Sequence, residues 1–209
     1  MPYIPPQNRP AINERVDALA ETIADQLEAE GQTAEISTYY REAFNTIADS
    51  IAALEGGESP ADDDAGALAE CVVDTASGYN QKGGWTGELN YAVTTLIQAV
   101  PFKLYERGVW EECLRYWLYA QTVGALTRTA YDVHERFGND WIGNGLAGVF
   151  EDIKDELKRR VNSAYEAAQI TKSGDCYNMM PYRTKLVEME KDEVSGYIEI
   201  LQKYQEPQG

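Results

Sequence analysis

Apolar residues recur every three to four positions along most of this chain, and no other feature constrains the fold as strongly. The pattern covers residues 11–30, 34–55, 87–100, 109–137, 146–170 and 182–204. That spacing gathers the apolar side chains on one face of an α-helix. The alternation of period two that a half-buried strand needs is missing nearly everywhere. The sequence therefore predicts an all-α fold, a helical bundle of about six to seven helices with one long central helix at residues 109–137.

Residues that break or cap helices mark the predicted ends of these segments. Gly31 follows the first helix and ends it. Thr86 is placed to cap the helix of residues 87–100, and Pro101 is placed to end it, because a proline disfavours helical geometry in the residue before it. The glycine-containing stretch 139–145 is predicted to be a turn between two helices.

Two shorter stretches complete the predicted organisation. Residues 58–66 form an acidic loop with a proline, and residues 67–77 form a short, weakly amphipathic helix. The first ten residues contain four prolines, which favours an extended segment. We expect this segment to place Tyr3 and Ile4 against an apolar surface of the protein.

The charge of the chain is strongly negative. Its 209 residues include 35 Asp and Glu against 18 Lys and Arg, a net charge of -17. Such a chain repels nucleic-acid backbones and anionic membranes, so neither is an expected partner. Three explanations of the charge stay open: a solvated acidic surface, as in proteins of a high-salt cytoplasm; a partner with a basic surface; or mimicry of DNA charge. No stretch approaches the length of a membrane span, which predicts a cytosolic protein.

The cysteines and the single histidine argue against metal or thiol chemistry. Cys71, Cys113 and Cys176 are far apart, odd in number and not in a metal-ligand spacing, so we expect reduced, buried side chains. His134 has no second His or Cys nearby, which disfavours a zinc site or a His-dependent triad. The sequence predicts no cofactor and no bound metal, and it identifies no catalytic residue.

A dense group of carboxylates lies on one predicted helix and suggests an enzyme as an alternative. Its members are Glu151, Asp152, Asp155 and Glu156. Residues four apart share a helix face, and such pairs bind magnesium in all-α nucleotide pyrophosphohydrolases. The other interpretation is a solvated acidic surface that neighbouring Lys and Arg residues neutralise.

A pair of arginines stands out in so acidic a chain. Arg159 and Arg160 lie in the same predicted helix, followed by Tyr165 and Glu166. A guanidinium group matches a phosphate or a carboxylate with two parallel hydrogen bonds. The pair therefore predicts either a site for an anionic group or ion pairs with neighbouring helices.

Aromatic residues of the segment 109–137 suggest self-association. Trp110, Tyr116, Trp117 and Tyr119 fall on more than one face of the predicted helix. An isolated amphipathic helix buries only one face. A subunit interface, a pocket between helices, or burial of this helix on all sides would each account for the pattern.

Three motifs are shared with a known family. They are an initial Met-Pro-Tyr-Ile, a Gly-x-Leu-Asn-Tyr-x-x-Thr helix start, and a paired Arg that leads to Tyr-Glu and then to Gly-Asp-x-Tyr. The matched residues are Met1 to Ile4, Gly87, Leu89, Asn90, Tyr91, Thr94, Arg159, Arg160, Tyr165, Glu166, Gly174, Asp175 and Tyr177. In these motifs the chain resembles a family of short, uncharacterised proteins of phages and prophages. The resemblance implies a viral origin and a shared core, but no mechanism.

The resemblance also implies a domain organisation, because members of that family are shorter than this chain. We expect a single helical domain, residues 1–209, with insertions at about 31–82 and 101–145. Residues 178–209 would then be a C-terminal helical extension.

Because two distant motifs occur together in the resembled family, we expect their polar residues to form one site. The predicted site comprises Asn90, Tyr91, Thr94, Arg159, Arg160, Tyr165, Glu166 and Asp175. Such groups suit an anionic small ligand such as a nucleotide, bound by a homo-oligomeric accessory protein. Three alternatives stay open: a virion component or acidic decoy, the magnesium-dependent hydrolase, and motifs that only fix helix packing.

Overall fold

The computed structural model describes residues 4–31, 35–76, 83–109, 120–163, 167–168 and 171–172. These residues form six α-helices and contain no strand, which confirms the predicted all-α bundle. The helices are α1 (Arg9–Glu30), α2 (Ile36–Glu55), α3 (Asp64–Ala76), α4 (Thr86–Glu106), α6 (Thr122–Phe137) and α7 (Trp141–Leu157). A 3-10 turn, Pro6–Asn8, precedes α1, and a π-helix, Lys158–Asn162, follows α7.

The chain divides into two compact units, Met1–Ala164 and Tyr165–Gly209. All six described α-helices belong to the first unit. The predicted helix at 182–204 and the predicted extension 178–209 lie outside the described residues. The same holds for residues 110–119, so the structure tests only the second half of the predicted long helix, where α6 begins at Thr122.

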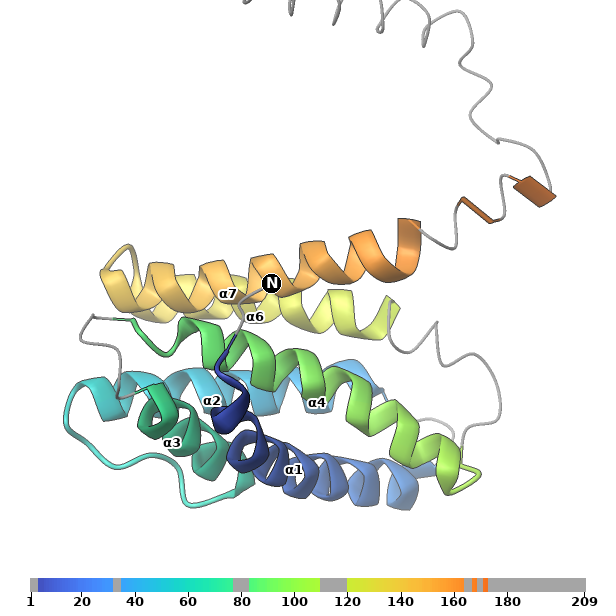
Figure 1. Ribbon diagram of the computed structural model, residues 1–209, viewed down its shortest axis with the longest axis horizontal. Helices are drawn as coiled ribbons and strands as arrows, with labels where there is room; N and C mark the ends of the chain where they lie inside the picture. The colour runs from blue at the N-terminus through green and yellow to red at the C-terminus, as the bar shows by residue number, and fades with distance from the viewer. Residues whose placement is uncertain are drawn as a thin grey trace, which may run out of the picture. The chain divides into compact units, whose positions relative to one another are not determined.

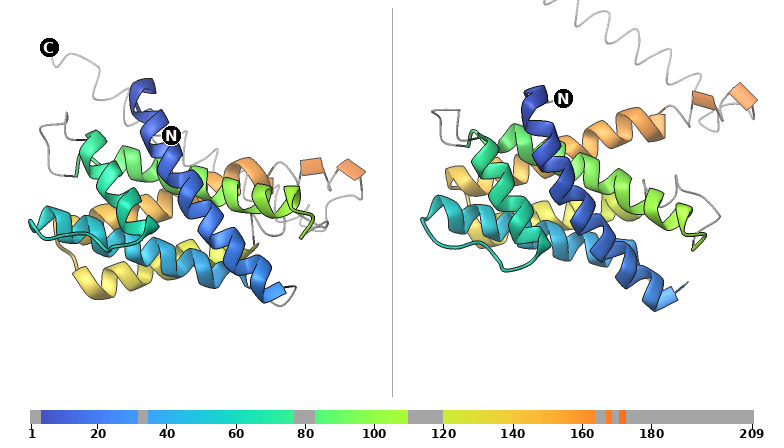
Figure 2. Two further views of the ribbon diagram at one scale, coloured as in Figure 1. Left: turned by 90° about the horizontal axis from the view of Figure 1, so that it is seen from below. Right: turned by 60° about the horizontal axis from the view of Figure 1, so that its bottom comes forward.

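Each helix of the first unit packs against two or three others, and the order of these contacts forms a closed ring. Going round it, α1 contacts α4, α4 contacts α7, α7 contacts α6, α6 contacts α2, α2 contacts α3, and α3 returns to α1 (Figure 1). In the views of Figure 2, α1 runs obliquely across α3 and α4. The helix α4 thus lies between α1 and α7.

The predicted apolar faces meet in one core inside this ring. Among its largest fully buried side chains are Trp85, Tyr40, Phe44 and Phe150. The Phe44 ring stacks on the Tyr40 ring, with 5.4 Å between their centroids, and lies 5.8 Å from the Phe150 ring. Ile4 is also buried, which confirms its predicted contact with an apolar surface, whereas Tyr3 lies outside the described residues.

One predicted helix end is wrong: α4 continues through Pro101 to Glu106. A proline has no N–H, so within a helix it leaves the carbonyl four residues earlier without its usual donor. Here that carbonyl belongs to Ile97, and the buried hydroxyl of Tyr40 on α2 donates to it at 3.2 Å. A side chain from another helix therefore replaces the missing hydrogen bond and lets α4 continue.

The predicted turn at 139–145 is also wrong in extent, because α7 begins at Trp141. The side chain of Asp140 caps the helix and accepts a hydrogen bond from the Gly143 N–H at 2.7 Å. A Cβ atom on Gly143 would lie 2.5 Å from the Gly138 carbonyl oxygen, too close for any other residue. Glycine here allows a tight α6–α7 corner instead of ending the helix.

Two other helix starts differ from the prediction. The N-cap of α4 is Trp85, without a side-chain capping bond, and the predicted cap Thr86 is the first helical residue. The helix α3 begins at Asp64 rather than at residue 67. Its first turn is held by the Asp63 carboxylate, which accepts a hydrogen bond from the Gly66 N–H at 2.8 Å.

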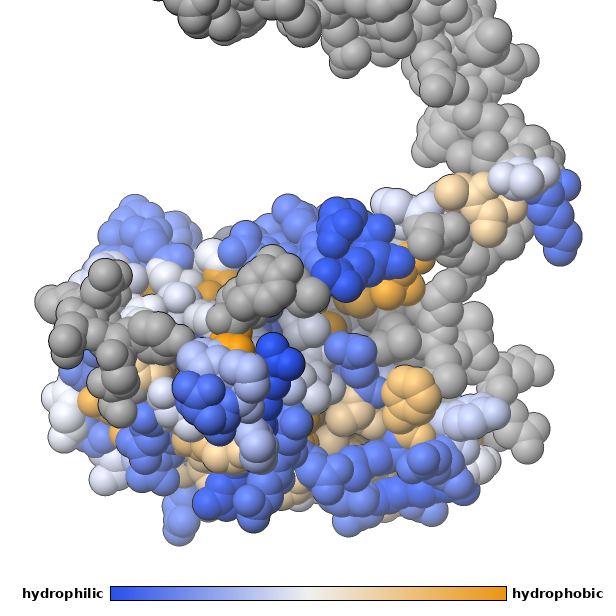
Figure 3. All heavy atoms as spheres, viewed as in Figure 1, coloured by the Kyte–Doolittle hydropathy of each residue, from blue (hydrophilic) through white to orange (hydrophobic). Residues whose placement is uncertain are grey.

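Hydrophilic residues cover most of the described surface on the face in Figure 3, with hydrophobic residues in small separate patches. The exposed large hydrophobic side chains among the described residues are Phe102, Tyr105, Tyr131 and Trp141. None of the described helices combines the length and the apolar character that crossing a membrane would require.

Candidate functional site

A cavity between α4 and α7 brings the two distant sequence motifs together. Its volume is about 470 Å³. It is lined by Thr86, Gly87 and Asn90 of α4, by Val149, Asp152, Asp155 and Glu156 of α7, and by Arg159 of the π-helix. We call it the α4–α7 cavity. Two of the predicted site residues, Asn90 and Arg159, are among those that line it.

The α4 wall is built on a well-packed stretch of helix. Leu89 and Val93 are buried in the core, and Asn90 lies beside them, half-buried. One turn further along the helix, the Thr94 hydroxyl donates to the Asn90 side-chain oxygen at 3.4 Å. The amide oxygen keeps a second lone pair and the amide NH₂ can donate, so Asn90 can offer both an acceptor and a donor to a ligand.

Tyr91, the third predicted residue of this motif, lies on the α1 side of α4. Its hydroxyl donates to the Asn13 side-chain oxygen at 3.0 Å, and the Arg9 guanidinium lies 5.8 Å from the centre of its ring. Both contacts attach the N-terminal half of α1 to α4. The structure thus gives Tyr91 a packing role and does not bring it to the cavity.

On the α7 wall, Glu156 is held by both arginines of the predicted pair. Arg159 donates from Nε to Oε2 and from Nη2 to Oε1 of Glu156, each at 2.8 Å. Arg160 donates from Nε to Oε1 of the same carboxylate. The hydrogen bonds from Arg159, followed by those from Arg160, lower the pKa of Glu156 to about 2. Glu156 is therefore ionised at any physiological pH.

The backbone around the arginines departs from α-helical geometry. Residues 158–162 form a π-helix, closed by a hydrogen bond from the Ser163 N–H to the Lys158 carbonyl. Short π-helical turns of this kind are frequent at functional sites. The side chains of Arg159 and Arg160 are 66% and 49% exposed, and their ion-pair partner among the described residues is Glu156 of the same helical stretch.

The other carboxylates of the α7 group differ in their surroundings. Asp152 and Asp155 are exposed and line the cavity, whereas Glu151 pairs with Lys154 and does not line it. Within the part of the chain that the structure describes, no three His, Cys, Asp or Glu residues are arranged to hold a metal ion. Asp152, Asp155 and Glu156 thus give the α7 wall of the cavity its negative charge.

The remaining predicted site residues are placed as follows. Arg160 contacts Glu156 but does not line the cavity. Tyr165, Glu166 and Asp175 lie outside the described residues. Of the cysteines, Cys71 is half-buried with a thiol whose pKa is raised by burial, and Cys113 and Cys176 lie outside the described residues. His134 is exposed in the last turn of α6.

Sequence reasoning separated residues that the structure brings together. It assigned Asp152, Asp155 and Glu156 to a rival enzyme site, and Arg159 to the ligand site, although all four line one cavity. The sequence did contain a signal that these four residues lie together. Residues three, four and seven positions apart lie on one helix face, and these four residues follow that spacing. Thr86 and Val149 follow the same spacing, four positions before Asn90 and three before Asp152, and sequence reasoning assigned neither to a ligand site.

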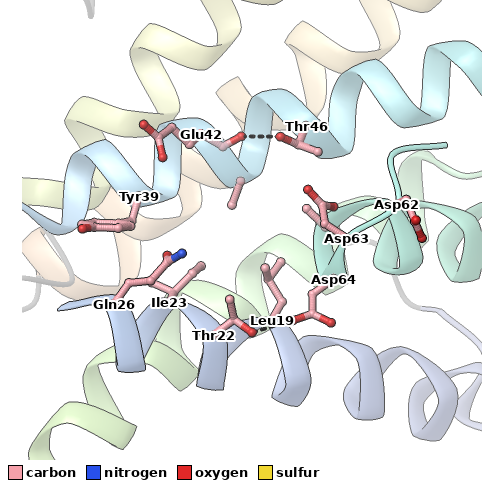
Figure 4. Close-up of a pocket in the computed structure, with 12 residues that line it drawn as sticks. Leu19, Thr22, Ile23, Gln26, Tyr39, Glu42, Thr46, Asp62, Asp63 and Asp64 are labelled. Carbon is pink, nitrogen blue, oxygen red and sulfur yellow. Dashed lines mark hydrogen bonds between the residues drawn. The ribbon is translucent and has the colours of Figure 1, made fainter. Parts of the chain in front are cut away.

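Two other cavities contain none of the predicted residues. The larger of these two, about 590 Å³, lies between α1, α2 and the start of α3 and is lined by four acidic residues and no Lys or Arg (Figure 4). Two of its carboxylates already have partners in the fold: Asp63 caps α3, and Asp64 accepts from the Thr22 hydroxyl at 2.5 Å. The third, about 380 Å³, lies between α2 and α6, and its Arg41 is bound by Asp132.

Comparison with known proteins identifies a family but no activity. No curated protein and no solved structure matches the chain. A family model described as a domain of unknown function (DUF6899) matches residues 1–141. The match includes the α4 wall of the cavity, with Asn90, and ends at the start of α7, before Arg159. Because it covers more than half of the residues, the chain belongs to the DUF6899 family.

Proposed function

We propose that the protein binds an anionic small ligand in the α4–α7 cavity, and that a nucleotide is the ligand class that suits this cavity best. One observation carries the proposal. Asn90 and Arg159, which come from two distant motifs of the sequence, line the same cavity. Two motifs that served only to fix separate helices would not need polar side chains directed at a common space.

The chemistry of the cavity supports a ligand with a phosphate and further polar groups. A guanidinium such as that of Arg159 binds a phosphate with two parallel hydrogen bonds. The side-chain amide of Asn90 suits a base or a sugar, whose polar atoms both donate and accept. The volume of about 470 Å³ falls within the range of about 300–1,000 Å³ that is usual for small-molecule sites.

The carboxylates narrow the ligand class further. Asp152 and Asp155 line the cavity and would repel a bare phosphate or sulfate ion. They would accept hydrogen bonds from the hydroxyl groups of a ribose and would attract a magnesium ion already bound to a nucleotide. We therefore expect nucleotides to bind better than inorganic phosphate, and better with magnesium than without it.

A magnesium-dependent hydrolase is the second candidate, because its predicted carboxylates Asp152, Asp155 and Glu156 line the same cavity. Glu156 is engaged by two arginines, and Asp155 lies 3.8 Å from the Lys158 ammonium group, which leaves Asp152 and the more weakly paired Asp155 for a metal. A metal held by two carboxylates would depend on the nucleotide's own phosphates for its other ligands. Binding without turnover is therefore the function we favour.

Self-association and a viral accessory role, in the host cytosol or in a virion, remain part of the proposal. Phe102 and Tyr105, on one side of α4, are 55% and 53% exposed. Large apolar side chains that stay exposed on neighbouring turns are typical of contact surfaces. Size-exclusion chromatography with light scattering would test self-association, and a monomer at all concentrations would contradict that part of the proposal.

The ligand proposal is tested by thermal shift and calorimetry with AMP, ATP and pyrophosphate, each with and without magnesium, at low and high salt. Bound ligand stabilises the folded protein, so we expect a higher melting temperature for the wild type. Arg159→Ala and Asn90→Ala should remove that shift. Arg15→Ala is the matched control, because Arg15 is an exposed arginine of α1 that does not line the cavity.

Either of two results would change the proposal. Absence of a shift with every nucleotide, in the presence and absence of magnesium, would contradict ligand binding. Release of phosphate or pyrophosphate that depends on magnesium and disappears in Asp152→Asn would identify the hydrolase instead.

A further inference from the structure

We infer that Glu156 occupies the position of the ligand's phosphate at Arg159, and that ligand binding displaces it while Arg160 continues to hold it. This inference rests on the proposed function, since it describes what occupies Arg159 in the same cavity before the ligand binds. It makes Glu156 an internal competitor of the ligand rather than a group that binds it.

The first support is the geometry of the Glu156–Arg159 pair. The Nε and Nη2 atoms of Arg159 each donate to a different oxygen of Glu156, at 2.8 Å in both cases. This is the side-by-side arrangement in which a guanidinium also binds two oxygens of a phosphate. The Nε–Nη2 edge of Arg159 is therefore already occupied. Two anions cannot accept from the same edge at once, so a phosphate that binds this edge, rather than the Nη1–Nη2 edge, must displace Glu156.

The second support is that Glu156 keeps a partner when Arg159 turns away. Arg160 donates from Nε to Oε1 of Glu156 and does not line the cavity. The consecutive positions of the two arginines place one facing the cavity and one beside it, with Glu156 between them. If a ligand displaced Glu156 from Arg159, the carboxylate would thus keep its hydrogen bond from Arg160 and its charge would still have a partner.

The third support is that, among the described residues, neither arginine has a hydrogen bond or ion pair with another helix. Arg159 is 66% exposed, Arg160 is 49% exposed, and both bind a residue of their own helical stretch. Exposed ion pairs within one helix are weak, and a phosphate offers more charge and more acceptor atoms than a carboxylate. A phosphate can therefore replace Glu156 without disturbing the packing of the bundle.

The test compares the dissociation constant of ADP, measured by calorimetry, among variants of the full-length protein. Removing the competitor in Glu156→Gln should lower the Kd about two- to fivefold, the range expected for release of one weak ion pair. Glu151→Gln is the matched control, because it removes the same charge from the same helix at a position that does not line the cavity. We expect its Kd to stay at the wild-type value.

A second variant tests the role of Arg160. Arg160→Ala leaves Glu156 with Arg159 alone, so the single variant should have a higher Kd for ADP than the wild type. The same substitution added to Glu156→Gln should leave the Kd unchanged. Equal Kd changes in Glu156→Gln and Glu151→Gln would show a general charge effect and overturn the inference, as would weaker binding in Glu156→Gln. Absence of ADP binding in the wild type and in every variant would overturn the proposed function and the inference together.

Discussion

Basic side chains on the α1–α4 surface and at the end of α7 make similar ion pairs with different results for the fold. On the first surface, Arg107, the residue that caps the C-terminus of α4, binds Glu21, Asp25 and Glu28 of α1. Lys103 of α4 binds Asp17 and Glu21. At the end of α7, Arg159 and Arg160 bind Glu156 of their own helical stretch. The first set joins two helices, whereas the second joins none among the described residues.

This difference separates basic side chains that hold helices together from basic side chains that can bind a ligand. Arg107 and Lys103 keep only 23% and 15% of their side-chain surface exposed, against 66% for Arg159. Side chains that cross between helices are fixed by the packing on both sides, and their loss should weaken the bundle. A cation whose partner sits in the same helix can exchange that partner for a ligand. The same reasoning applies to uncharged contacts between helices, such as the hydrogen bond from the Tyr40 hydroxyl to the Ile97 carbonyl.

The strongest effect is expected where a contact between helices is buried. Tyr40→Phe removes the hydroxyl that donates to the Ile97 carbonyl, which Pro101 leaves without a donor within α4. A buried carbonyl without a donor costs about 1–3 kcal/mol, so the free energy of unfolding should fall by that amount in urea denaturation. Tyr105→Phe is the control, because Tyr105 is exposed.

A double-mutant cycle shows whether the carbonyl is the cause. Pro101→Ala restores the N–H that would bond to Ile97 within α4, so Tyr40→Phe should cost less in that background. An equal cost in both backgrounds would mean that the hydroxyl stabilises the protein in some other way, and α4 would then need a different explanation for passing through a proline.

A smaller effect is expected at the partly exposed pair between α2 and α6. Arg41 donates to both oxygens of Asp132, at 2.7 and 2.8 Å, and this hydrogen bonding is the largest cause of a lowered pKa for Asp132. Asp132→Asn should cost about 1 kcal/mol at neutral pH, with the 44% exposure of Arg41 limiting the value.

The pH dependence has a definite sign. A carboxylate with a lowered pKa stabilises the fold fully above its ordinary value of 3.8 and loses that contribution as the pH falls through the folded value. The difference between the wild type and Asp132→Asn, measured by urea denaturation, should therefore narrow below pH 3.8. A difference that stays constant down to pH 3 would show that Asp132 does not act through its charge.

The same distinction explains what could be predicted from the sequence. Helical periodicity predicted the helices because each segment carries its own apolar face, as with Ile12, Val16 and Ile23 of α1. Local rules failed at Pro101 and Gly143, where the compensating groups come from elsewhere: the hydroxyl of Tyr40 on another helix, and the close approach of Gly138. No pattern within a single helix contains such partners.

The candidate site divides in the same way. Helical spacing places Asp152, Glu156 and Arg159 on one face, so their convergence was readable from the sequence. Asn90 and Tyr91 are neighbours in the sequence, and neighbouring residues of an α-helix point about 100° apart, so the two side chains need not face the same cavity. Which of the two would face α7 depended on the positions of α1 and α7, which no local pattern contains.

The smallest effect, and the sharpest test of the comparison, is expected for Arg159 in the protein without ligand. Arg107→Ala removes a cation that joins α4 to three carboxylates of α1 and should lower the melting temperature by about 2–4 °C. Arg159→Ala makes the same change of residue type at a cation bound within one helix, so its melting temperature should equal that of the wild type. If Arg159→Ala proved as destabilising as Arg107→Ala, Arg159 would belong to the packing of the bundle, and the ground for assigning it to a ligand would be lost.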